Sequence, residues 1–252
     1  MSKIVLITGA TSGFGKACAT QFAALGYHLI ITGRRKDRLD ALSNTLQQQH
    51  AIKVLPLCFD VQDREAVFNT LTQLPEEWKD IAVLINNAGL AAGRDSFEDA
   101  SVDDWDTMID TNIKGLLYVS KAITPFMIAR KKGHVINIGS IAGKETYEKG
   151  NVYCASKEAV DAISRAMRID LLKHGIKVTA IHPGAAETEF SLVRFKGNEA
   201  AAAKIYEGYQ PLSADDVAAV IVYCAQTPAH VCINDLVITP TAQANSYYLY
   251  KE

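Results

Sequence analysis

The sequence predicts an α/β fold: a single doubly wound parallel sheet with helices on both faces. Short apolar runs rich in β-branched residues recur along the chain, and longer stretches with helical periodicity separate them. Strands that are apolar throughout are typical of a parallel sheet buried on both faces. The helices between them supply the right-handed crossovers that parallel pairing needs. With 252 residues, 48% of them hydrophobic, the chain has the size of one core and enough apolar material to fill it.

Each element is expected from a local pattern. Six apolar runs predict strands at residues 4–8, 28–32, 52–59, 81–86, 134–138 and 176–181. The helices expected between them cover residues 15–25, 37–50, 64–74, 105–130 and 152–173. Gly26 ends the first helix, as glycine commonly does.

The pattern changes after Pro183. Residues 187–209 have a helical pattern but contain Gly197, Asn198 and a run of alanines. We therefore expect a mobile helical segment at about 187–210 that covers the substrate site. A helix near 214–226 and a last strand near 236–239 complete the chain. No linker, repeat or low-complexity segment divides it, which predicts one domain over residues 1–252.

Composition excludes several classes of function. The chain has 26 basic and 28 acidic residues without a basic block, so we expect no nucleic-acid partner. No apolar run has the length of a membrane helix, and the first residues lack a signal-peptide pattern. Five cysteines without metal-like spacing indicate reduced thiols and no metal site. These observations predict a cytoplasmic protein that acts on a small molecule.

A glycine-rich turn follows the first expected strand. It has the spacing G-x-x-x-G-x-G, formed by Gly9, Gly13 and Gly15. Such glycines let the chain turn tightly and let a diphosphate approach the first N–H groups of a helix, although a tight turn without a ligand is the alternative. Its place in an alternating strand and helix pattern favours dinucleotide binding. The expected contacts in the turn are Gly9, Thr11, Ser12, Gly13, Phe14 and Gly15.

The residues after the second strand predict which dinucleotide is bound. An NAD site usually has a carboxylate here, whereas this chain has Arg34 and Arg35, which suit the 2′-phosphate of NADP. The alternative for this pair is a solvated loop. Asp37 is close but fits the first turn of the next helix. After the third strand, Asp60 and Val61 are expected near the adenine, although Asp60 also suits a helix cap.

A tyrosine and a lysine lie one helical turn apart at Tyr153 and Lys157, after Ser140 at the end of the fifth strand. Residues four apart share a helix face, so the ammonium is expected beside the phenol. A nearby cation favours the phenolate and lowers the phenol pKa from about 10. The chemistry predicted is proton transfer by Tyr153 with Ser140 holding the substrate oxygen. A surface ion pair is the alternative for an isolated pair of this kind.

These residues, taken together, resemble the short-chain dehydrogenase/reductase family, whose fold is a Rossmann fold. The matching pieces occur in the family's order: residues 8–15, 86–89, Asn112, Ser140, Tyr153, Lys157 and 183–184. The resemblance implies that Tyr153 exchanges the proton, that Lys157 lowers its pKa and binds the nicotinamide ribose, and that Ser140 orients the substrate. It further implies that Asn112 supports a proton-relay water. Asn87, Pro183, Gly184 and Thr188 are implied cofactor contacts.

The C-terminal third resembles one group within that family, the NADP-dependent 3-hydroxy acid dehydrogenases, which include serine 3-dehydrogenase-like enzymes. This implies hydride transfer between NADP(H) and serine, 3-hydroxyisobutyrate, 3-hydroxypropionate or the matching semialdehydes. Arg194 is the candidate for a substrate carboxylate, with a solvent-facing arginine as the alternative. Two segments depart from the group, because residues 143–149 are more charged and the stretch between Gly184 and Thr188 is one residue short.

The resemblance implies a homotetramer built through the long helices around Trp105 and Tyr153. Two other functions stay open. One is a general carbonyl or 3-oxoacyl reductase of the same family, which would act on bulky carbonyls. The other is a dinucleotide-binding sensor without catalysis, for which Tyr153 beside Lys157 would serve no purpose.

Overall fold

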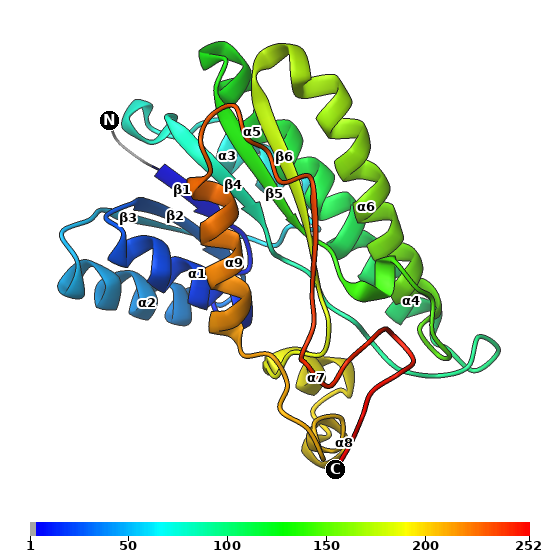
Figure 1. Cartoon of the computed structure of the whole chain (residues 1–252). Coiled ribbons are helices and arrows are strands. Elements are labelled where there is room, and N and C mark those ends of the chain that lie inside the picture. The colour runs from blue at the N-terminus through cyan, green and yellow to red at the C-terminus, as the bar shows by residue number, and fades with distance from the viewer. Residues whose placement is uncertain (1–3) are drawn as a thin grey trace.

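The computed structural model describes residues 4–252, which form a seven-stranded parallel sheet with helices on both faces (Figure 1). The strand order is β3-β2-β1-β4-β5-β6-β7. The strands are β1 (Ile4–Ile7), β2 (His28–Gly33), β3 (Val54–Cys58), β4 (Ile81–Asn86), β5 (Gly133–Ile138), β6 (Ile176–Pro183) and β7 (Asp235–Ile238). The predicted fold class is confirmed. The order reverses between β1 and β4, and a doubly wound sheet binds its ligand at such a point.

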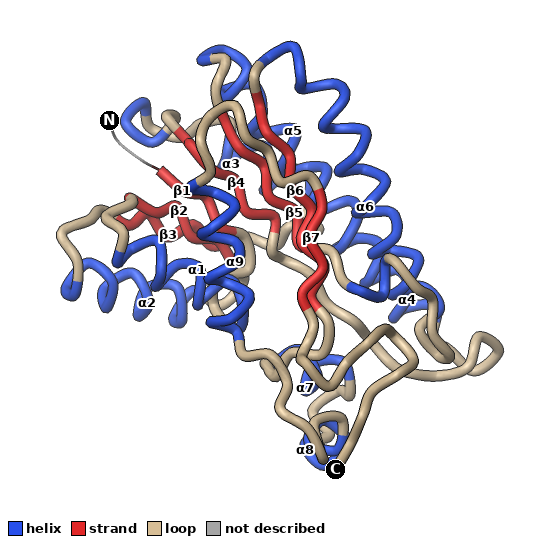
Figure 2. Tube along the Cα trace, viewed as in Figure 1, coloured by secondary structure: helices blue, strands red, loops and turns tan. Residues whose placement is uncertain are grey.

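Two helical layers cover the sheet (Figures 1 and 2). One contains α1 (Gly13–Ala24), α2 (Lys36–Gln49) and α9 (Ala214–Gln226), and the other contains α3 (Arg64–Leu71), α4 (Val102–Ile109), α5 (Leu116–Arg130) and α6 (Asn151–Leu171). Alternate residues of β1 pack on opposite faces of the sheet. Val5 and Ile7 lie in the core under α1, whereas Ile4 and Leu6 lie in the core under α3. This is the two-residue period of a strand buried on both faces.

The helix expected over residues 105–130 is found, and it begins three residues earlier, at Val102. A π-helical turn that the sequence did not predict, Asp110–Gly115, joins α4 to α5 without a break. Gly115 lies against Val61 so closely that an added Cβ would be 2.8 Å from the Val61 Cγ2 atom. The turn carries Asn112, whose side chain bonds to Leu90 in the segment after β4.

The segment after β6 forms two short helices, α7 (Glu189–Arg194) and α8 (Glu199–Lys204). Lys196 and Gly197 adopt positive φ and end the first helix. The side chain of Asn198 then accepts a hydrogen bond from the Ala201 amide and begins the second. Beside these helices runs the C-terminal segment, drawn in red in Figure 1. Over residues 4–252, no helix combines the length and apolar character that a membrane span requires.

Candidate active site

A cleft of about 680 Å³ opens at the carboxyl ends of the central strands. Both groups of predicted site residues line this cleft: those of the glycine-rich turn at residues 9–15, here called the phosphate turn, and those around Tyr153. The predicted residues that line it are Gly9, Thr11, Ser12, Gly13, Phe14, Arg34, Arg35, Asp60, Val61, Asn87, Ser140, Tyr153, Lys157, Pro183, Gly184, Thr188 and Arg194. Two others lie behind the wall: Gly15 supports the phosphate turn and Asn112 is buried.

The phosphate turn at residues 9–15 is tightly built. Gly9 and Gly13 have φ of 66° and 50°, a conformation that side chains with a Cβ rarely adopt. A Cβ on Gly15 would lie 2.3 Å from the Gly9 carbonyl oxygen. The Asn87 amide Nδ2 donates to the carbonyls of Thr8 at 2.8 Å and of Gly9 at 3.2 Å, which ties the turn to β4. The first N–H groups of α1 have no side-chain cap from Ser12, so they suit an anion.

Arg34 and Arg35 follow β2 and line the cleft beside the glycine-rich turn. The guanidinium of Arg34 pairs with Asp60 at 3.3 Å. Arg35 donates to the hydroxyls of Thr11 at 2.9 Å and Ser12 at 3.1 Å, so it is held over the phosphate turn and is not a free loop residue. Asp60 does not cap α3, because Asp63 does so. Residues that fit a 2′-phosphate and an adenine therefore lie together.

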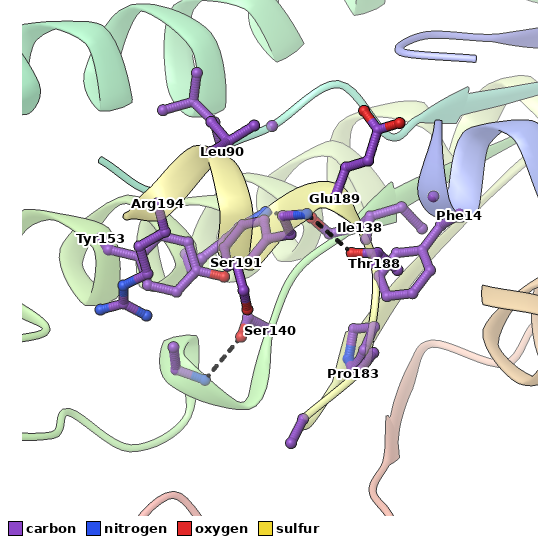
Figure 3. Close-up of a pocket in the computed structure, with 18 of the residues that line it drawn as sticks. Phe14, Leu90, Ile138, Ser140, Tyr153, Pro183, Thr188, Glu189, Ser191 and Arg194 are labelled. Carbon is purple, nitrogen blue, oxygen red and sulfur yellow. Dashed lines mark hydrogen bonds between the residues drawn. The ribbon is translucent and has the colours of Figure 1, made fainter. Parts of the chain in front are cut away.

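Tyr153, Lys157 and Ser140 line the other end of the cleft. Figure 3 shows Tyr153 and Ser140 there. All three are buried, with exposed fractions of 7%, 6% and 8%. The Lys157 Nζ donates to the Ile138 carbonyl at 2.9 Å, and burial lowers the pKa of Lys157 to about 8. Ser140 accepts from the Ala142 amide at 3.1 Å.

The expected effect of Lys157 on the tyrosine pKa is not found in this structure. Burial raises the pKa of Tyr153 above its ordinary value, while a hydrogen bond with Ser140 and the charge of Arg194 oppose that rise. Desolvation of the phenolate thus outweighs the nearby cations. Tyr153 is a neutral phenol at neutral pH, which is the form that donates a proton.

Asn112 joins the loop after β4 to α6. Its Oδ1 accepts from the Leu90 amide at 2.9 Å, and its Nδ2 donates to the Leu90 carbonyl at 2.8 Å and to the Ser156 hydroxyl at 2.9 Å. A Cβ on Gly89 would be 3.2 Å from Asn112 Oδ1 and 3.4 Å from Lys157 Nζ, so the two side chains flank this glycine. Asn112 is therefore a built part of the site and more than a polar interruption of a helix.

Arg194 points into the cleft from α7 (Figure 3). Its Nη1 donates to the Tyr147 hydroxyl at 2.8 Å and its Nε to the Gly93 carbonyl at 3.3 Å. The guanidinium carbon lies 5.4 Å from the centre of the Tyr153 ring. Its Nη2 is buried and has no hydrogen-bond partner among the described residues. Arg194 is therefore half-buried and held by Tyr147 and Gly93, and one buried donor of its guanidinium has no hydrogen-bond partner in the described part of the chain.

Sequence reasoning missed the residues that anchor the loop after Ser140. The charged stretch at residues 143–149 is explained by its contacts: Lys144 pairs with Asp161 at 3.1 Å and with Asp235, and Glu145 accepts from the Ser246 amide at 2.8 Å. These contacts bring the C-terminal segment to the cleft. Other lining residues that sequence analysis did not identify as site residues include Leu90, Tyr147, Glu189, Phe190, Ser191, Tyr206, Gln243, Ser246, Tyr247, Leu249 and Lys251. No local sequence signal marks them.

His182 packs beneath the same loop. It is fully buried, and its Nδ1 lies 3.2 Å from the Ser140 carbonyl oxygen. Its Nε2 lies 3.8 Å from Asp161 and 3.6 Å from Asp235. The ammonium of Lys144 lies among these groups and balances the carboxylates. His182 is thus a packed residue of the core, close to the backbone of the Ser140 loop.

The fold and the cleft together define a dinucleotide-dependent oxidoreductase that has a buried tyrosine and lysine at the nicotinamide end. A profile of the short-chain dehydrogenases matches residues 3–198. The chain belongs to this family.

Known relatives extend over nearly the whole chain. It is 47% identical to sulfoacetaldehyde reductase 2 of Chromohalobacter salexigens over 249 residues, 98% of both chains. It is 46% identical to the NADP-dependent 3-hydroxy acid dehydrogenase YdfG of Salmonella typhimurium over 242 residues, 96% of both chains. A solved structure, the closed form of serine dehydrogenase complexed with NADP⁺, superposes with a TM-score of 0.92 at 44% identity and covers 99% of both chains. The protein is thus an NADP-dependent oxidoreductase of this family.

Proposed function

We propose that this enzyme transfers hydride reversibly between NADP(H) and a small 3-hydroxy acid or its semialdehyde. Serine, 3-hydroxyisobutyrate and 3-hydroxypropionate are the types of acid we expect. The observation that carries the proposal is the buried Nη2 of Arg194, which has no hydrogen-bond partner among the described residues. The guanidinium carbon of Arg194 lies 5.4 Å from the centre of the Tyr153 ring. A guanidinium in that place suits an anionic group a few bonds from the reacting carbon.

The proposed chemistry assigns one task to each buried polar group. NADPH supplies the hydride when it is bound. In the reducing direction Tyr153 donates its phenolic proton to the substrate oxygen, which the Ser140 hydroxyl holds in place. The ammonium of Lys157 stabilises the phenolate that results, and Asn112 supports the path by which the proton is replaced. In the oxidising direction the same groups act in reverse.

The anionic group of the substrate has a second candidate. Arg194 suits a sulfonate as well as a carboxylate, and one relative is a sulfoacetaldehyde reductase. Malonic semialdehyde and sulfoacetaldehyde differ only in this group, so they form a matched pair of substrates. Neutral aldehydes and bulky ketones of similar reactivity test the alternative of a general carbonyl reductase.

The deciding experiment measures NADPH-dependent reduction of this panel by the wild type and by Arg194→Gln. Hydrogen bonds to a charged group contribute about 1.5–3 kcal/mol, so the variant should lose about 10- to 100-fold in kcat/KM on the anionic aldehydes and little on the neutral ones. Tyr147→Phe is the matched variant, because it removes the hydroxyl that holds Arg194 and keeps the charge. An equal loss on charged and neutral aldehydes would refute the anion role, and no turnover on any carbonyl would favour a sensor.

A further inference from the structure

Two arginines from the beginning of α2 converge on one carboxylate of α7. Glu189, the first residue of α7, accepts from Arg35 Nη1 at 3.0 Å and from Arg38 Nη1 at 2.8 Å. The partners are more than 150 residues apart in the sequence, so the pairing is purely tertiary. Hydrogen bonds and charge from both arginines hold the pKa of Glu189 below its ordinary value. Glu189 is therefore an anion at neutral pH.

This carboxylate lies at the adenine end of the cleft. Glu189 and Arg35 both line the cleft, together with Thr11 and Ser12, whose hydroxyls accept from Arg35. Arg38 is not a lining residue and reaches Glu189 from the side of α2. Arg35 thus shares its donors between the phosphate turn and Glu189. Any other anion that binds Arg35 here competes with Glu189.

We propose that Glu189 is an internal competitor for the 2′-phosphate of NADP(H), and that Arg38 sets the strength of this competition by holding the same carboxylate. A phosphate monoester carries more charge and more acceptor oxygens than one carboxylate, so it takes Arg35 from Glu189. Arg38 keeps Glu189 paired when Arg35 is withdrawn. NAD(H) lacks the 2′-phosphate and leaves the three-residue cluster unchanged. The inference goes beyond the proposed function and rests on its assignment of Arg35 to the 2′-phosphate.

The test compares NADP⁺ with NAD⁺, which differ only in that phosphate, by calorimetric titration of the intact protein. Glu189→Gln removes the competing charge, so NADP⁺ should bind about 3- to 5-fold more tightly, the size expected for an exposed ion pair. The affinity for NAD⁺ should stay the same. Glu187→Gln is the matched control, because it removes an exposed carboxylate two residues away that makes no ion pair among residues 4–252, and it should change neither affinity.

The role of Arg38 is tested with Arg38→Ala in the wild-type protein and in the Glu189→Gln variant. In the wild type, Arg38→Ala should weaken NADP⁺ binding about 2- to 3-fold, because Glu189 then relies on Arg35 alone. In the Glu189→Gln variant, Arg38→Ala should have no effect on NADP⁺ binding. The four proteins form a double-mutant cycle, which isolates the coupling between Arg38 and Glu189. An effect that persists would mean that Arg38 binds the phosphate directly, which would overturn its assigned role.

The remaining outcomes are equally decisive. Unchanged or weaker NADP⁺ binding by Glu189→Gln, or an equal gain for both dinucleotides, would overturn the competition. Arg35→Ala tests the assumption beneath it and should weaken NADP⁺ binding far more than NAD⁺ binding. If Arg35→Ala does not discriminate, the cofactor part of the proposed function fails. If it discriminates and Glu189→Gln does not, only the present inference fails.

Discussion

Gly15 offers a sharp test of how closely the phosphate turn is built. The residue lies in the first turn of α1, where alanine would ordinarily be preferred. A Cβ at this position would be 2.3 Å from the Gly9 carbonyl oxygen and 2.6 Å from Asn87 Nδ2. Both are groups that shape the turn. Gly15→Ala therefore sets helix propensity against a steric clash with the binding site.

The magnitudes decide between the two effects. Alanine gains about 1 kcal/mol over glycine inside a helix. Overpacking of a well-packed site costs about 1–3 kcal/mol, and here the obstacle is backbone that cannot turn aside like a side chain. The free energy of unfolding should therefore change little or fall by up to about 2 kcal/mol. The Gly9 carbonyl and Asn87 must move, so the affinity for NADP⁺ should fall by about 10-fold or more.

Thermal unfolding and calorimetric titration with NADP⁺ measure the two effects separately. Gly26→Ala is the control: Gly26 has a φ of 76° and a Cβ there would meet nothing within 4 Å. It should cost stability by backbone strain alone and leave NADP⁺ binding intact. A Gly15→Ala protein that is more stable than the wild type and binds NADP⁺ equally well would refute the steric reasoning.

Two further predictions concern proton transfer and assembly. Burial lowers the pKa of Lys157 to about 8, so the ammonium is present well below that pH and is lost above it. Reduction of the carbonyl should therefore be steady from pH 6 to about 7, fall to about half near pH 8 and decline further above it. Tyr153→Phe should reduce turnover by at least about 100-fold at every pH with NADP⁺ binding kept, and a reduction rate that climbs through pH 9 in the wild type would contradict the role of Lys157. For assembly, the family resemblance predicts four times the mass of the chain in light scattering. Ile169 and Leu172 at the end of α6 are 75% and 73% exposed and suit a subunit interface. Ile169→Glu with Leu172→Glu should then lower that mass, and a monomeric wild type would exclude the tetramer.

The fold was predictable because its signals are local. Apolar runs such as Ile81–Asn86 were recognised to within a residue or two, since strand and helix periods are carried by neighbouring residues. The π-helical turn at Asp110–Gly115 was not predictable, because no local pattern marks it and Gly115 packs there against Val61, which lies on another part of the chain. The same holds for the division of the segment after β6 into α7 and α8.

The site was predictable in part for the same reason. Glycine spacing in the turn and the four-residue spacing of Tyr153 and Lys157 are local, and these residues do line one cleft. The orientation of Arg194 was open, because it depends on hydrogen bonds to Tyr147 and Gly93, 47 and 101 residues away. The raised pKa of Tyr153 follows from burial, which the four-residue spacing to Lys157 does not report.

The sequence by itself determined the parallel sheet, the phosphate turn, the choice of NADP and the set of residues around Tyr153, because each follows from residue types at short spacing. Only the tertiary structure decided which side chains from distant segments close the cleft: the C-terminal segment held by Glu145, the free donor of Arg194, and Glu189 between Arg35 and Arg38. Such contacts depend on how whole layers pack, and packing brings together residues whose separation in the chain carries no periodic signal.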